Sequence, residues 1–364
     1  MSKQLLYQIA LTKIPKIGNV KAKQLISYCG GVEAVFKATK KELLKIPNIG
    51  AVITNNILQQ KVLAEAEKEI KFIEKYDIQT FFYLDKNYPS RLKHHNDSPV
   101  LLYHKGNTEL NTARTVAIIG TRKQTSRGKA ICEELVEGLI DLDVLVVSGL
   151  AYGVDITAHK KCVELNIPTI GIMGHGLDRI YPAEHKSTTR EMVKNGGLLT
   201  EFTSGTKPDR ENFPQRNRII AGLSDAVIVV ETAESGGSII TAHMANEYNK
   251  DVFAIPGRIN DKYSIGCNRL IKTHKAALLE SIEDLRYIMR WDVQKDKTTQ
   301  RALFVELEPE ERRIVELIRN QEDIDVDGIA FTTKFSTSQL STILLTLELK
   351  GIIKPIPGKR FIIL

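Results

Sequence analysis

Glycine, serine and arginine residues gather where short apolar runs of this sequence end. The small residues are Gly120 and Thr121 with Arg122 in one place, Ser148 and Gly149 in a second, and Gly236, Gly237 and Ser238 in a third. Arg210, Arg216 and Arg218 precede the apolar run that begins at Ala226. Open backbone N–H groups at helix starts and forked guanidinium groups are the donors that hold phosphate oxygens. The combination therefore predicts an anion site.

The common nucleotide-enzyme motifs are missing from the sequence. The loop 120–128 lacks the G-x-G-x-x-G spacing of a dinucleotide fold, and no G-x-x-x-x-G-K-[ST] phosphate loop occurs. No metal-binding motif is present either, so we predict neither a cofactor nor a metal. One enzyme hypothesis stays open. The stretch 235–241 resembles the phosphate loop of the cytokinin-activating phosphoribohydrolases, with Glu201 or Glu231 as its acid–base group.

Strand and helix patterns alternate from residue 115 onward and would position these loops. We expect strands over 115–119, 144–147, 168–172, 198–201, 226–231 and 252–255. Helical patterns fall near 127–140, 155–166, 186–195, 216–223, 238–248 and 268–275. Near-continuous apolar strands joined by helices are typical of a parallel sheet covered on both faces. The predicted fold class is α/β with a Rossmann-like parallel sheet, whose ligand would lie beyond the carboxyl ends of the strands.

The positive charge of the chain is concentrated at its start. The 364 residues carry a net charge of +7, and residues 1–79 hold 13 lysines against 7 acidic side chains. This excess indicates either a polyanionic partner or a solvated lysine-rich face, and charge alone does not separate them. The length fits two or three domains of about 100–200 residues each.

Neither a membrane span nor a secretory signal is predicted. No apolar run reaches the roughly 18–20 residues that a bilayer requires, and the first twelve residues lack the apolar core of a signal peptide. The cysteines Cys29, Cys132, Cys162 and Cys267 lie far apart. They are expected to be free thiols in a reducing compartment, so the predicted location is cytoplasmic.

The first 79 residues contain an internal repeat. Lys13–Val20 (KIPKIGNV) matches Lys45–Val52 (KIPNIGAV), and each copy lies between helical stretches. This is the plan of a helix-hairpin-helix (SAM-like) domain, in which the glycine and the next helix start can approach a phosphate. Lys21 and Lys23 add charge to the first copy, so we expect the second copy to serve packing more than binding. Nucleic-acid binding and protein docking are both open for this domain.

The C-terminal residues predict a winged helix. Helices are expected over 309–320, from about 325, and over 338–349 after Ser336 as N-cap, followed by strands at 352–355 and 360–364. The third helix is rich in leucine and ends in a single cation, Lys350. A helix that reads DNA would be more basic, so we expect a structural or protein-contact role.

Several strings resemble the DNA-processing protein A family, also called DprA or Smf. The most specific is Asn212–Asp225 (NFPQRNRIIAGLSD), and others are Val147–Asp155 and Phe253–Gly257. The similarity extends from about residue 85 to 290, and the helical front and winged-helix tail match the family's three-part layout. We therefore expect a helical domain over 1–79, a Rossmann-like domain over 80–291, a linker over 292–308 and a winged helix over 309–364.

The resemblance implies a single-stranded-DNA-binding protein of natural transformation that is not an enzyme. Members protect incoming strands and load the RecA recombinase. Carried over by motif, Arg122 would clamp a phosphate, Phe213 would stack on a base, and Arg210 stands where the family usually has lysine. The pocket floor would include Arg216, Asn217 and Arg218. The candidate DNA-binding residues are Gly120, Thr121, Arg122, Ser148, Gly149, Arg210, Asn212, Phe213, Arg216, Asn217, Arg218, Gly236, Gly237 and Ser238.

The resemblance also implies a homodimer formed through the Rossmann-like domain. The helical pattern at 268–275 and a short strand at 276–279 close the far end of the sheet in chain order. Because an uncovered sheet edge seeks a partner, we expect self-association there, on a surface that overlaps the recombinase contact. The apolar candidates are Leu270, Ile271, Leu278 and Leu279.

Overall fold

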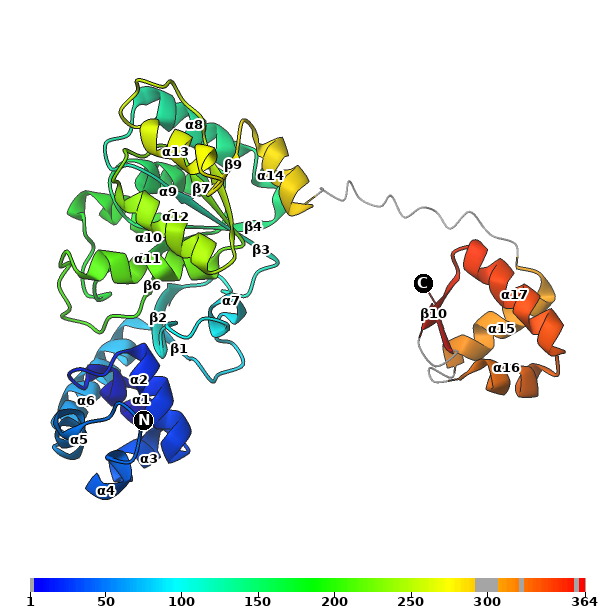
Figure 1. Cartoon of the computed structure of the whole chain (residues 1–364), viewed down its shortest axis with the longest axis horizontal. Coiled ribbons are helices and arrows are strands. Elements are labelled where there is room, and N and C mark those ends of the chain that lie inside the picture. Colours follow the sequence, from blue (N-terminus) through cyan, green and yellow to red (C-terminus); the bar gives the residue numbers. More distant parts are fainter. Residues whose placement is uncertain (1–2, 292–306, 321–323, 357–359, 364) are drawn as a thin grey trace. The chain divides into compact units, whose positions relative to one another are not determined.

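The computed structural model describes residues 3–291, 307–320, 324–356 and 360–363 (Figure 1). The chain divides into two compact units, Met1–Asp292 and Val293–Leu364. The first unit contains a bundle of helices followed by a large sheet with helices around it. Over the described ranges, no helix is both long enough and apolar enough to cross a bilayer.

Six helices form the front of the first unit. They are α1 (Lys3–Lys13), α2 (Asn19–Cys29), α3 (Val32–Lys37), α4 (Lys40–Leu43), α5 (Ala51–Leu58) and α6 (Val62–Tyr76). The two repeat copies form the hairpins between α1 and α2 and between α4 and α5. Their backbones match, because Lys16 and Asn48 occupy equivalent positions and take φ values of 68° and 61°. Both copies therefore adopt the predicted helix-hairpin-helix arrangement.

A nine-stranded sheet forms the centre of the first unit. Its strands are β1 (Gln79–Phe82), β2 (Leu101–Gly106), β3 (Arg114–Ile119), β4 (Val144–Ser148), β5 (Thr169–Ile172), β6 (Gly196–Thr200), β7 (Ala226–Val229), β8 (Asp251–Ala254) and β9 (Ala277–Leu278), in the order β1-β2-β6-β5-β4-β3-β7-β8-β9. The strands from β6 to β9 in that order pair in parallel, which confirms the predicted Rossmann-like class. β1 and β2 add an antiparallel extension that the sequence patterns did not predict.

Helices cover both faces of this sheet. The connecting elements are α7 (Ser90–Lys93), α8 (Ser126–Glu137), η1 (Ile140–Leu142), α9 (Val154–Glu164), η2 (Ala183–His185), α10 (Lys186–Met192), α11 (Asn212–Leu223), α12 (Gly237–Glu247), α13 (Ile265–Lys272) and α14 (Ile282–Met289). One layer contains α8, α9 and α10, and α7, α11 and α12 lie together on the opposite face (Figure 1). The central strands are buried along their length because both faces are covered.

The helical front packs against the antiparallel extension of the sheet (Figure 1). A single buried cluster contains the apolar side chains of α1 to α6 together with Phe82, Val100, Leu101 and Tyr103. The front and the sheet therefore share one core.

The first repeat copy makes polar contacts with the sheet domain. Asn19 Oδ1 accepts the Val100 N–H at 2.9 Å, and Lys23 Nζ donates to Ser98 Oγ at 2.7 Å and to the His95 carbonyl at 3.2 Å. Burial lowers the pKa of Lys23 to about 8, with partial compensation from a nearby carboxylate.

The second repeat copy presents exposed residues where the first makes these contacts. Ala51 and Asn55, which correspond to Asn19 and Lys23, are both exposed. The first copy is therefore the docking element of the front, whereas Ile46, Ile49 and Ile53 of the second copy pack in the core, as predicted for that copy.

The far edge of the sheet also differs from expectation. β9 is the terminal strand, as predicted, and Leu278 is 41% exposed on it. Leu270 and Leu279 are only 2% and 0% exposed, and Ile271 is half-buried. The expectation that Leu270 and Leu279 offer an exposed apolar surface needs correction, because both side chains belong to the core of the subunit.

The second unit has the helix and strand order of a winged helix. It contains α15 (Pro309–Asn320), α16 (Val326–Thr333), α17 (Thr337–Leu349), β10 (Ile353–Ile356) and β11 (Arg360–Ile363), and the two strands pair antiparallel. Ser336 caps α17 as predicted, in a reciprocal capping box with Gln339. Most of the predicted linker and the predicted turn at 357–358 lie outside the described residues.

Candidate nucleic-acid interface

A cavity of about 630 Å³ lies beyond the carboxyl ends of β3 and β7. At β3 the chain order of the sheet reverses, because β4 to β6 lie on one side of it and β7 to β9 on the other. Ligands of open α/β sheets bind in the gap that such a reversal leaves between loops. Of the predicted residues, those that line the cavity are Gly120, Thr121, Arg122, Arg210, Phe213, Arg216, Asn217, Gly236, Gly237 and Ser238.

Arg216 is a buried cation in the wall of this cavity. Its side chain comes from α11, the residue is 5% exposed, and burial lowers the pKa of its guanidinium to about 10. Nη1 donates to the Ile172 carbonyl at 2.5 Å, whereas Nε has no hydrogen-bond acceptor within the described part of the chain. Asp155 is the nearby counter-charge; burial raises the pKa of this carboxyl and Arg216 opposes that rise. Because the Arg216 residue lines the cavity, its positive charge would attract an anion bound there.

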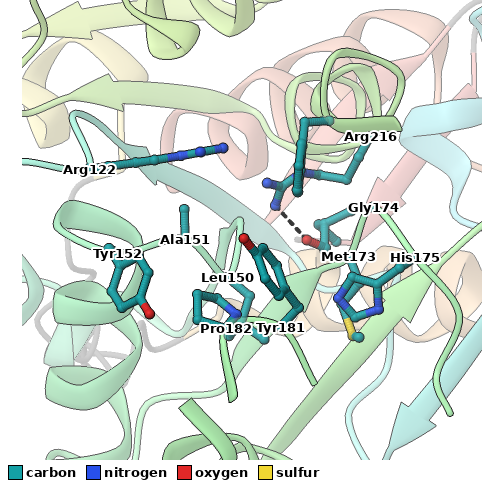
Figure 2. Close-up of a pocket in the computed structure, with 12 residues that line it drawn as sticks. Arg122, Leu150, Ala151, Tyr152, Met173, Gly174, His175, Tyr181, Pro182 and Arg216 are labelled. Carbon is teal, nitrogen blue, oxygen red and sulfur yellow. Dashed lines mark hydrogen bonds between the residues drawn. The ribbon is translucent and has the colours of Figure 1, made fainter. Parts of the chain in front are cut away.

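Arg122 and Arg210 are exposed cations of the same cavity. Figure 2 shows Arg122 and Arg216 extending toward each other from opposite sides of the site. In the described ranges no carboxylate lies within 4.0 Å of Arg122 or Arg210. Three guanidinium groups face one Asp155 carboxylate here, so the cavity has an excess of positive charge.

Phe213 places an aromatic ring between these cations. Its ring centre is 5.3 Å from the guanidinium carbon of Arg122 and 6.0 Å from that of Arg216. The ring also borders a smaller adjoining pocket, whose walls include Tyr181 and Tyr152 (Figure 2). The Tyr181 ring lies 6.5 Å from Phe213 at an interplanar angle of 34°, and Tyr181 is 49% exposed. Exposed ring faces beside guanidinium groups are suited to stacking with a planar base.

The predicted small residues have two different positions. Gly237 lines the cavity with open space beside it, at the start of α12, where first-turn N–H groups lack helical acceptors. Ser148 and Gly149 lie beneath the cavity instead. Ser148 Oγ donates to the Ile118 carbonyl, and a Cβ on Gly149 would collide with the side chains of Arg216 and Asp155. Gly149 therefore makes room for the buried arginine.

Two predicted residues of α11 lie outside the cavity. Arg218 turns toward the helical front, where Nη2 pairs with Glu201 Oε2 at 2.5 Å and Nη1 donates to the Asp97 carbonyl at 2.6 Å. Its placement in the pocket floor is therefore corrected. Asn212 Nδ2 donates to the Lys207 carbonyl at 3.1 Å and closes the loop before the helix.

The two carboxylates of the enzyme hypothesis are engaged elsewhere. Glu231 accepts both the side-chain and the backbone donors of Thr125 at the start of α8. Glu201 accepts from Arg218 and, at 3.0 Å, from Asn19. As far as the chain is described, neither carboxylate lines the cavity, so neither faces a ligand bound there.

The cavity also contains residues that sequence reasoning did not single out as site residues. Asp155, Pro208, Thr232 and Ile240 all contribute to its wall. Only Asp155 carried a usable signal, because it ends one of the strings that led to the family resemblance.

Comparison with known proteins agrees with this fold. Residues 79–290 match the family described as DNA recombination-mediator protein A, and residues 299–359 match the DprA winged helix domain. Protein Smf of Synechocystis is 30% identical over an alignment of 394 positions that covers 98% of each chain. DNA processing protein DprA of Streptococcus pneumoniae is 35% identical over 68% of this chain and 92% of its own.

Solved structures of relatives share this fold over much of the chain. The X-ray structure of the Streptococcus pneumoniae protein matches with a TM-score of 0.69 and 33% identity, over 78% of this chain and 97% of that one. DNA processing protein A from Helicobacter pylori, described for its single-stranded DNA binding mode, matches with a TM-score of 0.54 and 32% identity, over 60% of this chain and 97% of that one. By sequence and by fold, the chain belongs to the DNA processing protein A (DprA/Smf) family.

Proposed function

We propose that this protein binds single-stranded DNA, without sequence preference, in the cavity beyond β3 and β7. The observation that carries the proposal is Arg216, a buried arginine in the cavity wall whose guanidinium carbon lies 6.0 Å from the centre of the Phe213 ring. The charge of Arg216 attracts a backbone phosphate, and the exposed guanidinium groups of Arg122 and Arg210 hold phosphate oxygens.

Bases of the strand stack on the aromatic wall. Phe213 and Tyr181 present ring faces, and every base has a π-face, so this contact does not select a sequence. A duplex keeps its bases paired and stacked inside, so it cannot use these rings. The Helicobacter pylori relative, described for its single-stranded DNA binding mode, supports this assignment.

The biological setting of the proposal comes from the family resemblance. The protein would act in the cytoplasm during natural transformation, where it protects an incoming strand and loads the RecA recombinase. It would do so as a homodimer whose interface includes the β9 edge, where Leu278 is exposed. Two sites on one strand would raise the apparent affinity through effective concentration.

A salt titration of binding tests the proposal. A labelled single strand, the matching duplex and a nucleoside monophosphate are compared for the wild type, Arg122→Gln, Arg210→Gln and Arg190→Gln, the last an exposed arginine of α10 outside the cavity. The single strand should bind best, and each cavity variant should flatten the log–log salt slope by about 0.7, the value of one single-strand phosphate contact.

Three outcomes would contradict the proposal. One is an unchanged slope in both cavity variants, and another is an equal loss in Arg190→Gln. The third is release of a free base from the monophosphate, which would favour the phosphoribohydrolase hypothesis instead.

A further inference from the structure

The loop that brings Arg210 to the cavity is held at its other end by the helical front. The loop 201–211 connects β6 to α11. In it, Ser204 donates its N–H to Glu69 Oε1 at 2.8 Å and its hydroxyl to Glu69 Oε2 at 2.5 Å. Glu69 lies on α6 and is 4% exposed. One loop residue of the sheet domain therefore engages both oxygens of a buried carboxylate from the front.

Further hydrogen bonds hold the part of the loop between Ser204 and the cavity. The next residue, Gly205, has a φ of 82° and donates its N–H to Asp178 Oδ1 at 2.9 Å. At the far end of the loop, Asn212 Nδ2 holds the Lys207 carbonyl. The segment that presents Arg210 is thus fixed on both sides, and Ser204 is its contact with α6.

The first repeat copy adds a second contact with the same loop. Lys13 Nζ lies 3.4 Å from Thr203 Oγ1 and 3.1 Å from Glu65 Oε2, and the Lys13 side chain is only 19% exposed. Its counterpart in the second copy, Lys45, is exposed. The front therefore contacts the loop through two elements, the first hairpin and α6.

We propose that Glu69 is a positioning residue for DNA binding. By holding Ser204, it keeps the loop in the conformation that directs Arg210 into the cavity, so the helical front strengthens a phosphate contact without touching the strand. Hydrogen bonds to an ionised carboxylate are about twice as strong as neutral ones, which suits them to holding a loop. This inference rests on the proposed function of the cavity.

The test uses the full chain and the variant Glu69→Gln. The neutral amide keeps the size of the side chain but replaces one acceptor oxygen with an N–H₂ group. That group is itself a donor, so it cannot accept a hydrogen bond from Ser204. Glu67→Gln is the matched control, because Glu67 is an exposed residue of the same helix and its substitution changes the net charge equally. Each is combined with Arg210→Gln and, separately, with Arg122→Gln, and single-strand affinity is measured across a range of salt concentrations.

Glu69→Gln should weaken binding roughly three- to tenfold, as expected for residues coupled through a shared network. It should also flatten the log–log salt slope by about 0.7, as loss of the Arg210 contact does. The effect should vanish in the Arg210→Gln background and persist in full beside Arg122→Gln. Loss of folded protein alone would lower the active fraction and leave the slope unchanged.

Ser204→Ala, which removes only the hydroxyl donor, repeats the test if Glu69→Gln does not fold. The inference is overturned if a folded variant binds single-stranded DNA as tightly as Glu67→Gln does. It is also overturned if the variant lowers the affinity equally in the Arg210→Gln and Arg122→Gln backgrounds, as expected if the front contacted DNA directly. If Arg122→Gln and Arg210→Gln themselves bind like the wild type, the proposed function fails instead.

Discussion

Removing Arg218 should destabilise the protein strongly without weakening DNA binding. Arg218 and Glu201 form an ion pair whose side chains are 11% and 10% exposed. Glu201 Oε1 already has no hydrogen-bond partner among the described residues. Burial raises the pKa of this carboxyl, and the charge of Arg218 and the hydrogen bond from Asn19 both act to lower it. The variant Arg218→Met would leave a buried carboxylate with the Asn19 amide as its remaining donor. Removing one partner of a buried ion pair lowers the free energy of unfolding by about 3–5 kcal/mol. This is a large share of the total of about 5–15 kcal/mol that is typical of a folded protein.

Urea unfolding measures this loss, provided that the dependence of the unfolding free energy on urea stays the same. The double variant Arg218→Met/Glu201→Met should be at least about 2 kcal/mol more stable than the single variant, because an apolar pair removes the stranded charge. Single-strand affinity of the folded fraction should stay within about twofold of wild type, since Arg218 lies outside the cavity. A loss below about 1 kcal/mol in the single variant, or a tenfold fall in affinity, would refute the reasoning.

Three more outcomes are expected. Phe213→Leu should weaken single-strand binding by roughly 1–3 kcal/mol in an anisotropy titration, whereas Tyr287→Leu, an 83% exposed ring outside the cavity, should change nothing; equal losses would remove the stacking role. Burial lowers the pKa of His104 and His159 to about 4, from 6.5. The unfolded chain therefore takes up protons first as the pH falls below 6.5, and each histidine should cost about 2 kcal/mol of stability at pH 5 relative to pH 8, measured by denaturant unfolding; a flat profile would contradict this. Deleting residues 292–364 should leave single-strand affinity within about threefold, because that segment has no net positive charge, and a tenfold loss in a folded protein would assign DNA binding to the winged helix.

The parallel strands and the cavity could be predicted because their signals are local. Each central strand is a short run of apolar, mostly β-branched residues, and a parallel sheet brings the residues after such runs to one edge. Arg122, Phe213 and Arg216 lie together for this reason. β1 and β2 were not predicted, because their place in the sheet depends on antiparallel pairing of β1 with β2 and of β2 with β6.

Other features depend on long-range packing that no local pattern contains. Arg216 and Arg218 are two positions apart on α11, so they point about 200° apart around the helix. The string that contains both does not tell which one faces the sheet edge. Likewise, Lys13 and Lys45 have nearly the same neighbours in sequence, and only the docking of the front distinguishes the half-buried Lys13 from the exposed Lys45.

The core shared by the helical front and the sheet constrains what a shorter protein of this kind can be. Phe82, Val100, Leu101 and Tyr103 are each at most 2% exposed, and their cover comes from the front helices. A chain that began at β1 would present these four side chains as one apolar patch, which in a soluble protein invites association. A relative that lacks the helical front should therefore differ from this chain at these four positions. Polar residues there would identify such a relative.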